Sequence, residues 1–362
     1  MFQIEMLPAQ FGDCLWIEYG SPGDRRRVLI DGGTAPTYEV LRDRLTQLPK
    51  SQRSFELVVI SHVDADHIEG VVRLLGDERL GMQVEDVWFN GWRHLNPPPG
   101  DMLGPVQGEF LSALIRKRRL PWNVAFDGKA AFVPKGEPPL VTLPGGLQIT
   151  LLSPRAEALA KLRKVWQREV KRNGLDPDDP EAALRRLATR KALLPADALG
   201  EQRPNVPQLA NKPYKSDQSL ANGSSIAFLA EYEGKRVLFA ADALPATLEE
   251  SLRRLLDASG ADRLPVQALK IAHHGGRKNI SSDLLKLLVC PRYLVSTNGD
   301  RYAHPHQESI ARILIHGGIR KEIFFNYRTE YNQVWNDPSL RARYGYQAFY
   351  PSGDRPGSVV DL

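Results

Sequence analysis

Residues 57–70 read LVVISHVDADHIEG, and this stretch decides how the rest of the 362-residue sequence is interpreted. Its apolar, β-branched start predicts a buried strand, and a helix is expected to open near Ile68. Between the two lie four potential metal ligands in six residues: His62, Asp64, Asp66 and His67. Extended residues two apart point the same way, so the first two can share one ion. The last two, at the start of a helix, can reach a neighbouring ion.

The composition is that of a chain with a sizeable core and without a membrane or secretory signature. Hydrophobic residues make up 42% of the sequence, but no apolar run of ~18 residues occurs. Residues 1–20 alternate like a strand and lack the basic and apolar regions of a secretory signal. Cys14 and Cys290 are too few for a disulfide scaffold. We therefore expect a cytoplasmic protein with no membrane partner.

The net charge of +5 is concentrated in one segment. Residues 155–215 carry fourteen Lys/Arg against eight Asp/Glu. Helices are expected there over residues 156–172 and 181–191, and both are basic and rich in Ala and Leu. We interpret 155–215 as a helical insertion or cap. It would lie between the two halves of one domain, residues 1–154 and 216–362, and the second half would end in a turn-rich C-terminal tail.

The first of these helices surrounds Trp166 with basic side chains. They are Lys161, Arg163, Lys164, Arg168, Lys171 and Arg172. Such a cluster could hold the phosphates of a nucleic acid while one base stacks on the indole, and it could also bind a partner protein. Alternatively, the charges form a solvated helical face and Trp166 packs the insertion onto the body. We expect the packing role for Trp166 and keep the basic residues as candidate nucleic-acid contacts.

Several other predicted strands lead into a His or an Asp. These residues are Asp31, Asp242, the pair His273 and His274, and, in a later turn, His304. Taken singly, each can be read as a helix cap or a polar turn. A hydrolytic site with two metal ions about 3.5–4 Å apart needs about this many ligands at one edge of a sheet. The recurrence of this pattern favours a shared site over separate coincidences.

These motifs resemble the metallo-β-lactamase fold superfamily, and specifically the hydrolase domain of the bacterial competence protein ComEC. The resemblance is carried by FGDCLWIEY, LIDGG, SHVDADHIEG, NGSSIAFLAEYEGKRVLFAADA, LKIAHHGG and the HP of YAHPH. It implies an α/β fold, an αββα sandwich in which two sheets pack face to face with helices outside. The metal site would lie at one edge of the sandwich.

The resemblance also implies roles for individual residues. The metal ligands would be His62, Asp64, Asp66, His67, Asp242, His273 and His274. The first two would hold one metal, the next two a second metal, and Asp242 would bridge both. Whether His273 or His274 completes the second site stays open. Asp66 and His304 are the candidate catalytic residues, and His304 would orient the substrate or protonate the leaving group.

Three departures from the family pattern affect these expectations. Asp64 stands where most of the superfamily carries His, and no His occurs in the stretch before the bridging Asp, where Asn222 is a candidate substrate contact. A site richer in carboxylate favours Mn²⁺ or a similar hard ion relative to Zn²⁺, and can hold the first metal weakly. Ala241 stands where the ComEC-like branch usually has Gly. An alanine is accommodated there unless the backbone needs a positive φ.

The sequence therefore predicts a metal-dependent hydrolase with two divalent ions, Mn²⁺ or Zn²⁺. The leading hypothesis is a phosphodiesterase or nuclease that cleaves DNA with a metal-bound hydroxide. One alternative is a hydrolase of a small ester, thioester, lactone or cyclic nucleotide, since one fold hosts many chemistries. The other is a non-catalytic protein that binds metal or nucleic acid.

Overall fold

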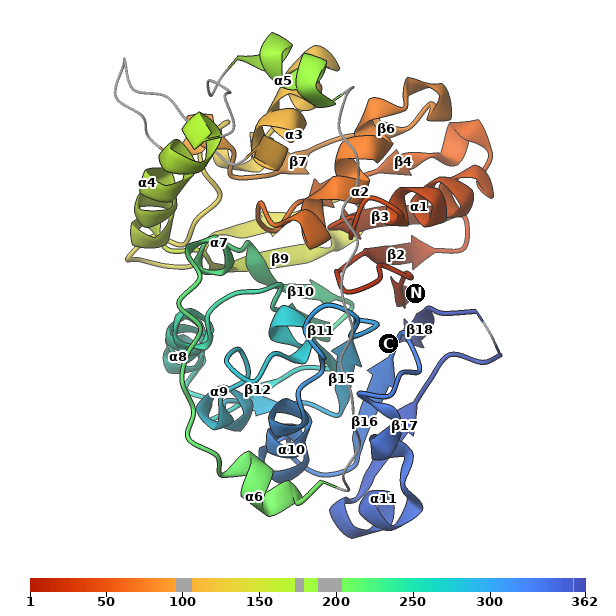
Figure 1. The fold of residues 1–362 in the computed structure, drawn as a ribbon, viewed down its shortest axis with the longest axis vertical. Helices are drawn as coiled ribbons and strands as arrows, with labels where there is room; N and C mark the ends of the chain where they lie inside the picture. Colours follow the sequence, from red (N-terminus) through yellow and green to blue (C-terminus); the bar gives the residue numbers. More distant parts are fainter. Residues whose placement is uncertain (96–105, 173–178, 188–203, 354) are drawn as a thin grey trace.

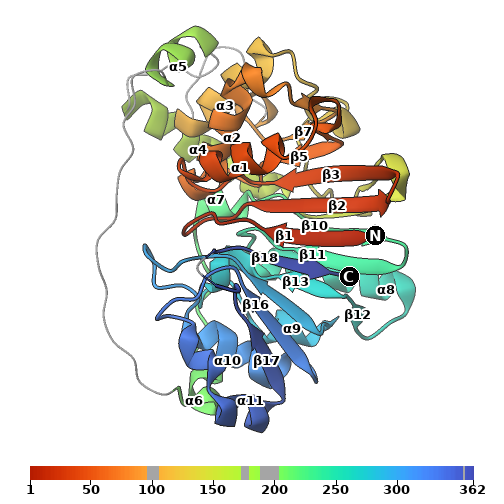
Figure 2. The same cartoon turned by 90° about the vertical axis from the view of Figure 1, so that its right-hand side faces the viewer.

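Two sheets packed face to face form the centre of the molecule, and helices cover the outer face of each (Figures 1 and 2). This is a computed structural model, and it describes residues 1–95, 106–172, 179–187, 204–353 and 355–362. The αββα sandwich predicted from the sequence is confirmed. Among the described helices, none has the length and apolar character needed to cross a bilayer.

The first sheet has the strand order β18-β1-β2-β3-β5-β7. Its strands are β1 (Phe2–Met6), β2 (Leu15–Ser21), β3 (Asp24–Ile30), β5 (Leu57–Val59), β7 (Val87–Trp88) and β18 (Ser358–Asp361). β3, β5 and β7 run parallel to one another. A parallel strand covered on both faces is apolar throughout, and every residue of β5 is buried accordingly.

The second sheet has the order β17-β16-β15-β13-β11-β10-β9-β8. Its strands are β8 (Leu140–Thr142), β9 (Gln148–Ser153), β10 (Ala227–Tyr232), β11 (Lys235–Phe239), β13 (Ala268–Lys270), β15 (Arg292–Val295), β16 (Lys321–Phe325) and β17 (Tyr346–Phe349). From β11 to β17 neighbouring strands are parallel. Their carboxyl ends therefore meet at one edge, where the polar side chains collect. Two small sheets add β4 (Ser54–Phe55) with β6 (Gln83–Val84) and β12 (Leu264–Pro265) with β14 (Leu288–Val289).

The core has three layers that follow from this architecture. The middle layer lies between the sheets and contains residues of both, among them Trp88 and Phe228. One outer layer packs the first sheet against α1 (Thr37–Thr46), α2 (Ala65–Gly76) and α3 (Val106–Lys117). The other packs the second sheet against α8 (Pro245–Ser259), α9 (Ser282–Lys286), α10 (Gln307–His316) and α11 (Pro338–Tyr344).

The C-terminal residues are more regular than the turn-rich tail expected from the sequence. They form α11, β17 and β18, and β18 pairs with β1 so that Asp361 lies opposite Gln3 (Figure 2). Both strands are four residues long and only partly buried, so they carry almost no hydrophobic pattern. Their position is determined by pairing with a sheet edge that has already formed. The pairing of β18 with β1 joins the last strand of the chain to the first.

The helices of the insertion pack onto the first half of the chain. α4 (Ala156–Arg172) and α5 (Pro180–Leu187) lie beside α3 (Figure 1). Trp166 is fully buried, and its Nε1 donates to Glu109 Oε1 of α3 at 3.2 Å. This is the packing role expected for Trp166. Residues 188–191 of the second expected helix lie outside the described residues, and the division at 154 and 215 stays a prediction.

Gly108 of α3 makes room for Trp166, which gives a test of this packing. A Cβ at Gly108 would lie 2.7 Å from two atoms of the indole. In an open helix Ala is about 1 kcal/mol more favourable than Gly, but overpacking costs about 1–3 kcal/mol. We expect Gly108→Ala to lower the free energy of unfolding in urea by about 1 kcal/mol.

Gly76 of α2 is the matched control, because a Cβ there would meet nothing within 4 Å. Gly76→Ala should leave the free energy of unfolding unchanged or raise it. Equal stabilisation by both substitutions would contradict the contact between Gly108 and Trp166.

Residues 204–223 return the chain from the insertion to the sheet edge. α6 (Val206–Ala210) packs against α10, and α7 (Leu220–Gly223) precedes β10. Lys212 pairs with Glu308 of α10 at 2.9 Å, and Asp217 N donates to the Lys278 carbonyl oxygen at 3.1 Å. These contacts bring Asp217 and α7 to the edge where β11 and β13 end.

Candidate metal centre

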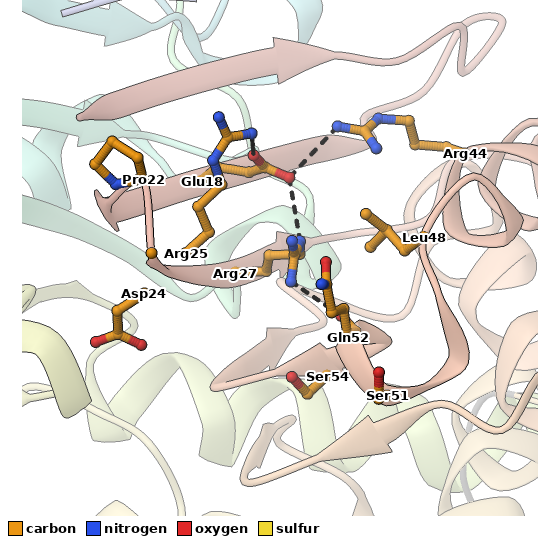
Figure 3. A pocket seen from close by; sticks show the side chains of 11 residues that line it. Glu18, Pro22, Asp24, Arg25, Arg27, Arg44, Leu48, Ser51, Gln52 and Ser54 are labelled. Carbon is orange, nitrogen blue, oxygen red and sulfur yellow. Dashed lines mark hydrogen bonds and ion pairs between the residues drawn. The ribbon is translucent and has the colours of Figure 1, made fainter.

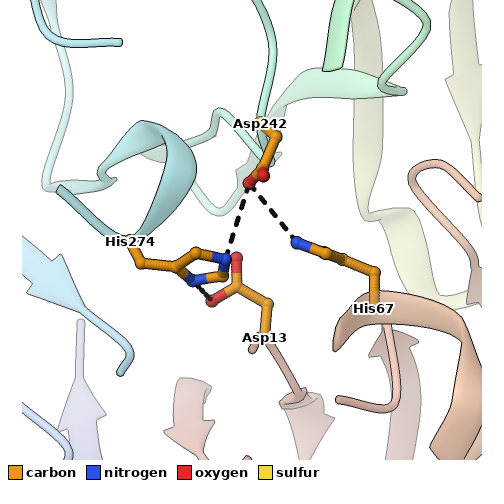
Figure 4. Close-up of side chains that lie close together, drawn as sticks. All are labelled: Asp13, His67, Asp242 and His274. Carbon is orange, nitrogen blue, oxygen red and sulfur yellow. Dashed lines mark ion pairs between the residues drawn. The ribbon is translucent and has the colours of Figure 1, made fainter. Parts of the chain in front are cut away.

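Asp242 lies at the centre of a group of histidines where the strands of both sheets end (Figure 4). Its Oδ1 is 3.5 Å from His67 Nε2 and 3.9 Å from His274 Nε2. Its Oδ2 is 3.6 Å from His273 Nε2 and 3.8 Å from His62 Nε2. These separations exceed a hydrogen bond, whereas two ligand atoms of one tetrahedral zinc ion stand about 3.3 Å apart.

Two more carboxylates flank this group, one on each side. Asp64 Oδ2 lies 3.5 Å from His62 Nε2, and Asp66 Oδ2 lies 3.6 Å from His274 Nε2. The structure thus brings together all the residues predicted to be metal ligands: His62, Asp64, Asp66, His67, Asp242, His273 and His274. Their ligand roles are developed below as a proposal.

The protein holds the far ring nitrogen of the histidines that face Asp242 Oδ1. His67 Nδ1 is 2.8 Å from Asp31 Oδ2. His274 Nδ1 is 3.0 Å from the Ser296 carbonyl oxygen and 3.3 Å from Asp13 Oδ1. Histidines that bind metals are usually held in this way, because a partner on one nitrogen fixes the ring and directs the other nitrogen at the ion.

The two histidines facing Asp242 Oδ2 are held similarly. His62 Nδ1 lies 3.0 Å from the Ser61 hydroxyl oxygen, which donates to Asp31 at 2.7 Å. His273 Nδ1 lies 3.0 Å from Asn279 Oδ1. All four histidines therefore turn Nε2 toward the same carboxylate.

Four of the atoms that face the centre lack hydrogen-bond partners within the part of the chain that the structure describes. They are His62 Nε2, His67 Nε2, His274 Nε2 and Asp242 Oδ1, and all are buried. Buried polar atoms are nearly always paired, so a group of orphans at one point indicates a missing partner. Divalent cations on either side of Asp242 would satisfy these atoms, and imidazole with carboxylate is a suitable donor set for Zn²⁺ or Mn²⁺. The cluster therefore fits a divalent metal.

Asp13 is a site residue that the sequence reasoning missed. It is 1% exposed, and its Oδ2 accepts from Lys270 Nζ at 2.6 Å. One of its oxygens lies within 4.8 Å of ligand atoms of His67, Asp242 and His274. Its Oδ1 lies 3.3 Å from His274 Nδ1 and has no hydrogen-bond partner among the described residues, so Asp13 stands behind the His274 ring beside its ion pair with Lys270. FGDCLWIEY includes this residue, but spacing cannot reveal a partner 257 positions away.

The cluster concentrates negative charge that attracts cations. Burial alone would raise the pKa of Asp242, but His273, His67 and His274 hold it well below its ordinary value. Burial alone would lower the pKa of His67, but Asp242 and Asp31 raise it well above its ordinary value. Burial also opposes protonation of His274, and Asp13 with Asp242 raises its pKa to about 9. The carboxylates that raise the pKa values of these histidines would also attract a metal ion.

Left-handed backbone recurs at the turns that carry these residues. The φ angle is 59° at Asp31, 45° at Ala241, 49° at His273 and 55° at His274. Such a conformation costs a non-glycine residue about 1–2 kcal/mol, and strain of this kind gathers at functional sites. Position 241 is thus one where glycine would be relaxed and alanine is strained.

His304 stands beside the cluster rather than within it. Its ring centroid is 5.2 Å from that of His273, and burial followed by the charge of neighbouring histidines lowers its pKa well below the ordinary value. It lines a pocket of about 440 Å³ together with Asp64 and Asn222. Arg277 and Lys278, both exposed, also line this pocket.

A second pocket, of about 450 Å³, opens at the start of β3 (Figure 3). Asp31, which contacts His67 of the cluster, follows the other end of that strand. Three arginines reach this pocket: Arg25, Arg27 and Arg44. All three lie within 3.6 Å of the buried carboxylate of Glu18. Their charge is therefore directed at the protein itself, and the pocket by the histidines is the stronger candidate site.

The basic residues of the insertion are only partly described. Lys161 is exposed and Arg163 is half-buried. The side chains of Lys164, Arg168, Lys171 and Arg172 lie outside the described residues. The nucleic-acid contacts expected for all six therefore stay a prediction.

Asp31 provides a test of how the protein holds the centre. We expect Asp31→Asn to weaken binding of one divalent ion about 10- to 100-fold, because loss of a partner behind a ligating histidine has effects of this size. Calorimetric titration of the metal-free protein with Zn²⁺ or Mn²⁺ measures it. Asparagine also tolerates the left-handed φ of this position, so folding should be preserved.

Asp127→Asn is the matched control, since Asp127 is an exposed aspartate with a φ of 54°. It should leave both metal affinities unchanged. Identical isotherms for the two variants would show that Asp31 does not support the centre.

Comparisons with known proteins agree with the sequence motifs. A model of the Metallo-beta-lactamase superfamily matches residues 7–80, the segment that carries Asp13, Asp31 and the SHVDADHIEG motif. This segment therefore has the sequence pattern of that superfamily. No curated protein matches the chain.

Solved structures give only distant likenesses. The metallo-β-lactamase fold protein YhfI from Bacillus subtilis aligns at 9% identity with a TM-score of 0.40, over 100% of both chains. Zinc-bound PqqB from Methylobacterium extorquens aligns at 13% identity with a TM-score of 0.41, also over 100% of both chains. A mutant of the CmlA β-hydroxylase aligns at 12% identity and 0.40, over 100% of this chain and 54% of its own. Scores this low carry no argument about function.

Proposed function

We propose that this protein is a two-metal hydrolase of phosphodiesters, a nuclease acting on DNA. The observation that carries the proposal is the position of Asp242, with two imidazole nitrogens beside each carboxylate oxygen. A bridging carboxylate of this kind suits two divalent ions about 3.5–4 Å apart. Bound there, the ions would supply a nucleophile at neutral pH and neutralise the charge that develops on a phosphoryl group.

The pocket beside the cluster supports a phosphate-containing substrate. Arg277 and Lys278 both line it, and cations in a pocket beside a metal centre suit the oxygens of a phosphodiester. His304 lines the same pocket, and because its pKa is lowered, its neutral imidazole would orient the substrate by a hydrogen bond rather than protonate the leaving group. The resemblance of the motifs to the ComEC-type hydrolase domain also favours DNA.

The size of the pocket favours a second candidate, a hydrolase of a small phosphodiester or ester. A volume of about 440 Å³ is suited to a single small molecule. The two candidates differ in how KM depends on salt concentration, because affinity for a strand of phosphates falls steeply as the salt concentration rises. A flat salt profile of KM would favour the small substrate.

The test is an assay of labelled single- and double-stranded DNA and RNA with Mn²⁺, Zn²⁺, Mg²⁺ or chelator. Metal-dependent cleavage by the wild type is expected, with a loss of about 10³-fold or more in Asp66→Ala, because one of the ions loses a ligand. Asp283→Ala, on the exposed face of α9, is the control and should cleave like the wild type. Cleavage that persists in the presence of chelator, or that is as fast in Asp66→Ala as in the wild type, would overturn the proposal. Metal binding without turnover on any substrate would leave the protein in the non-catalytic class.

A further inference from the structure

We propose that His273 is a ligand of the first metal, on the Oδ2 side of Asp242, and that His274 alone completes the second site, on the Oδ1 side. The inference rests on the proposed two-metal function, and it assigns the ligands of each ion. It also supplies the imidazole that the sequence lacks near Asn222.

The two consecutive histidines turn to opposite oxygens of one carboxylate. Both have left-handed φ angles, and their ring planes stand 71° apart with centroids 5.8 Å apart. His273 Nε2 faces Asp242 Oδ2 at 3.6 Å, and His274 Nε2 faces Asp242 Oδ1 at 3.9 Å. A single ion could bind both Nε2 atoms only if one of the two rings turned away from the Asp242 oxygen that it now faces.

The neighbours of each oxygen complete two matched donor sets. Beside Oδ2, His62 lies 3.8 Å away and is 3.5 Å from Asp64. Beside Oδ1, His67 lies 3.5 Å away, and Asp66 reaches the same side through its 3.6 Å approach to His274. Each ion would then have two imidazoles, one carboxylate of its own and the shared Asp242.

A separate group of polar residues holds the His273 ring in this position. Asn279 Oδ1 lies 3.0 Å from His273 Nδ1, and Asn279 Nδ2 donates to Asp217 Oδ2 at 3.0 Å. Asn222 Nδ2 donates to the same Asp217 oxygen at 2.6 Å and lies 3.3 Å from His273 Nδ1. Asn222 is therefore a positioning residue for His273. A network that fixes Nδ1 is what a metal-binding histidine needs in order to present Nε2.

Equal donor sets replace the expectation of a first site poor in imidazole. With the same ligand types on both sides, the two ions should have similar affinities and the same metal preference, rather than a weak hard-ion site beside a stronger one. The competing interpretation is that Asp217 and His273 form a general acid–base pair that binds no metal. Metal stoichiometry separates the two, because only a ligand changes it.

The experiment is titration of the metal-free protein with Zn²⁺, read by calorimetry and by elemental analysis after desalting. The wild type is expected to bind two equivalents. His273→Asn and His274→Asn should each keep one equivalent at wild-type affinity and weaken the other about 100-fold or more. His304→Asn, a histidine in the same pocket outside the donor sets, should keep two.

Double variants show which ion each histidine serves. His273→Asn combined with Asp64→Asn should still bind one equivalent, because both residues serve the same ion. His273→Asn combined with Asp66→Asn should bind none, because each substitution removes a different ion. The reverse pattern, or two tight equivalents in His273→Asn, would overturn the assignment.

A milder variant covers the case in which a histidine substitution disturbs folding. Asn222→Ser should weaken one equivalent about 10-fold and leave the other unchanged, since it loosens only the network behind His273. Two unchanged equivalents in Asn222→Ser would count against the inference. Two equivalents in the wild type without cleavage of any substrate would overturn the proposed function and leave the assignment standing. No bound ion in the wild type would overturn both.

Discussion

Asp242→Asn is expected to remove both divalent ions from this protein. Asparagine keeps the shape of the side chain but loses the charge that two pairs of imidazoles face at 3.5–3.9 Å. Removing one partner of a buried charged group costs about 3–5 kcal/mol, equivalent to a loss of affinity between about 10²-fold and 4 × 10³-fold. Because the carboxylate is shared, the loss should affect both binding events. Calorimetric titration with Zn²⁺ or Mn²⁺ measures both affinities.

Asp257→Asn, at an exposed position of α8, is the matched control and should bind metal like the wild type. Asp66→Asn is the informative comparison, because it should weaken only one ion. If Asp242→Asn also loses only one ion, the bridging role is wrong, and the two positions have separate ligands.

Lys270→Met is expected to lower the free energy of unfolding by about 3–5 kcal/mol. Lys270 and Asp13 are 0% and 1% exposed and lie 2.6 Å apart, so the substitution leaves a buried carboxylate without its cation. His274 remains beside it, at 3.3 Å. Urea unfolding in the presence of chelator measures the effect without the contribution of bound metal.

A double-mutant cycle separates the pair from its surroundings. The double variant Lys270→Met with Asp13→Asn should lower the free energy of unfolding by about 1–3 kcal/mol less than the sum of the two single variants. The reason is that the double variant leaves neither charge unpaired. Lys286→Met is the control, since its 3.0 Å pair with Asp283 is exposed, and it should change stability by less than about 1 kcal/mol. Strict additivity of the buried pair would contradict a direct charge interaction.

Much of the site could be predicted because strand ends carry its ligands. The run LVVI has the apolar character of a strand covered on both faces, and β5 is buried throughout. The polar residues that follow it therefore had to lie at the edge of the sheet. The same reasoning placed Asp242 and the His273–His274 pair there, since β11 and β13 are parallel neighbours in the second sheet.

The rest depends on side-chain contacts and backbone angles that spacing does not encode. Asp13 meets Lys270 across 257 positions, and Asp217 meets Asn279 across 62. His273 and His274 turn to opposite oxygens of Asp242 because both have left-handed φ angles, and a histidine in the sequence does not predict such an angle. β17 and β18 were missed because four-residue, half-exposed strands are set by the sheet edge they join.

The most direct measurement is anomalous scattering at the metal edge from crystals soaked with Zn²⁺ or Mn²⁺. Two peaks about 3.5–4 Å apart are predicted on either side of Asp242. One should lie among Oδ1, His67, His274 and Asp66, and the other among Oδ2, His62, His273 and Asp64. Absence of any peak beside Asp242, in crystals where these side chains are ordered, would contradict a metal centre at this position.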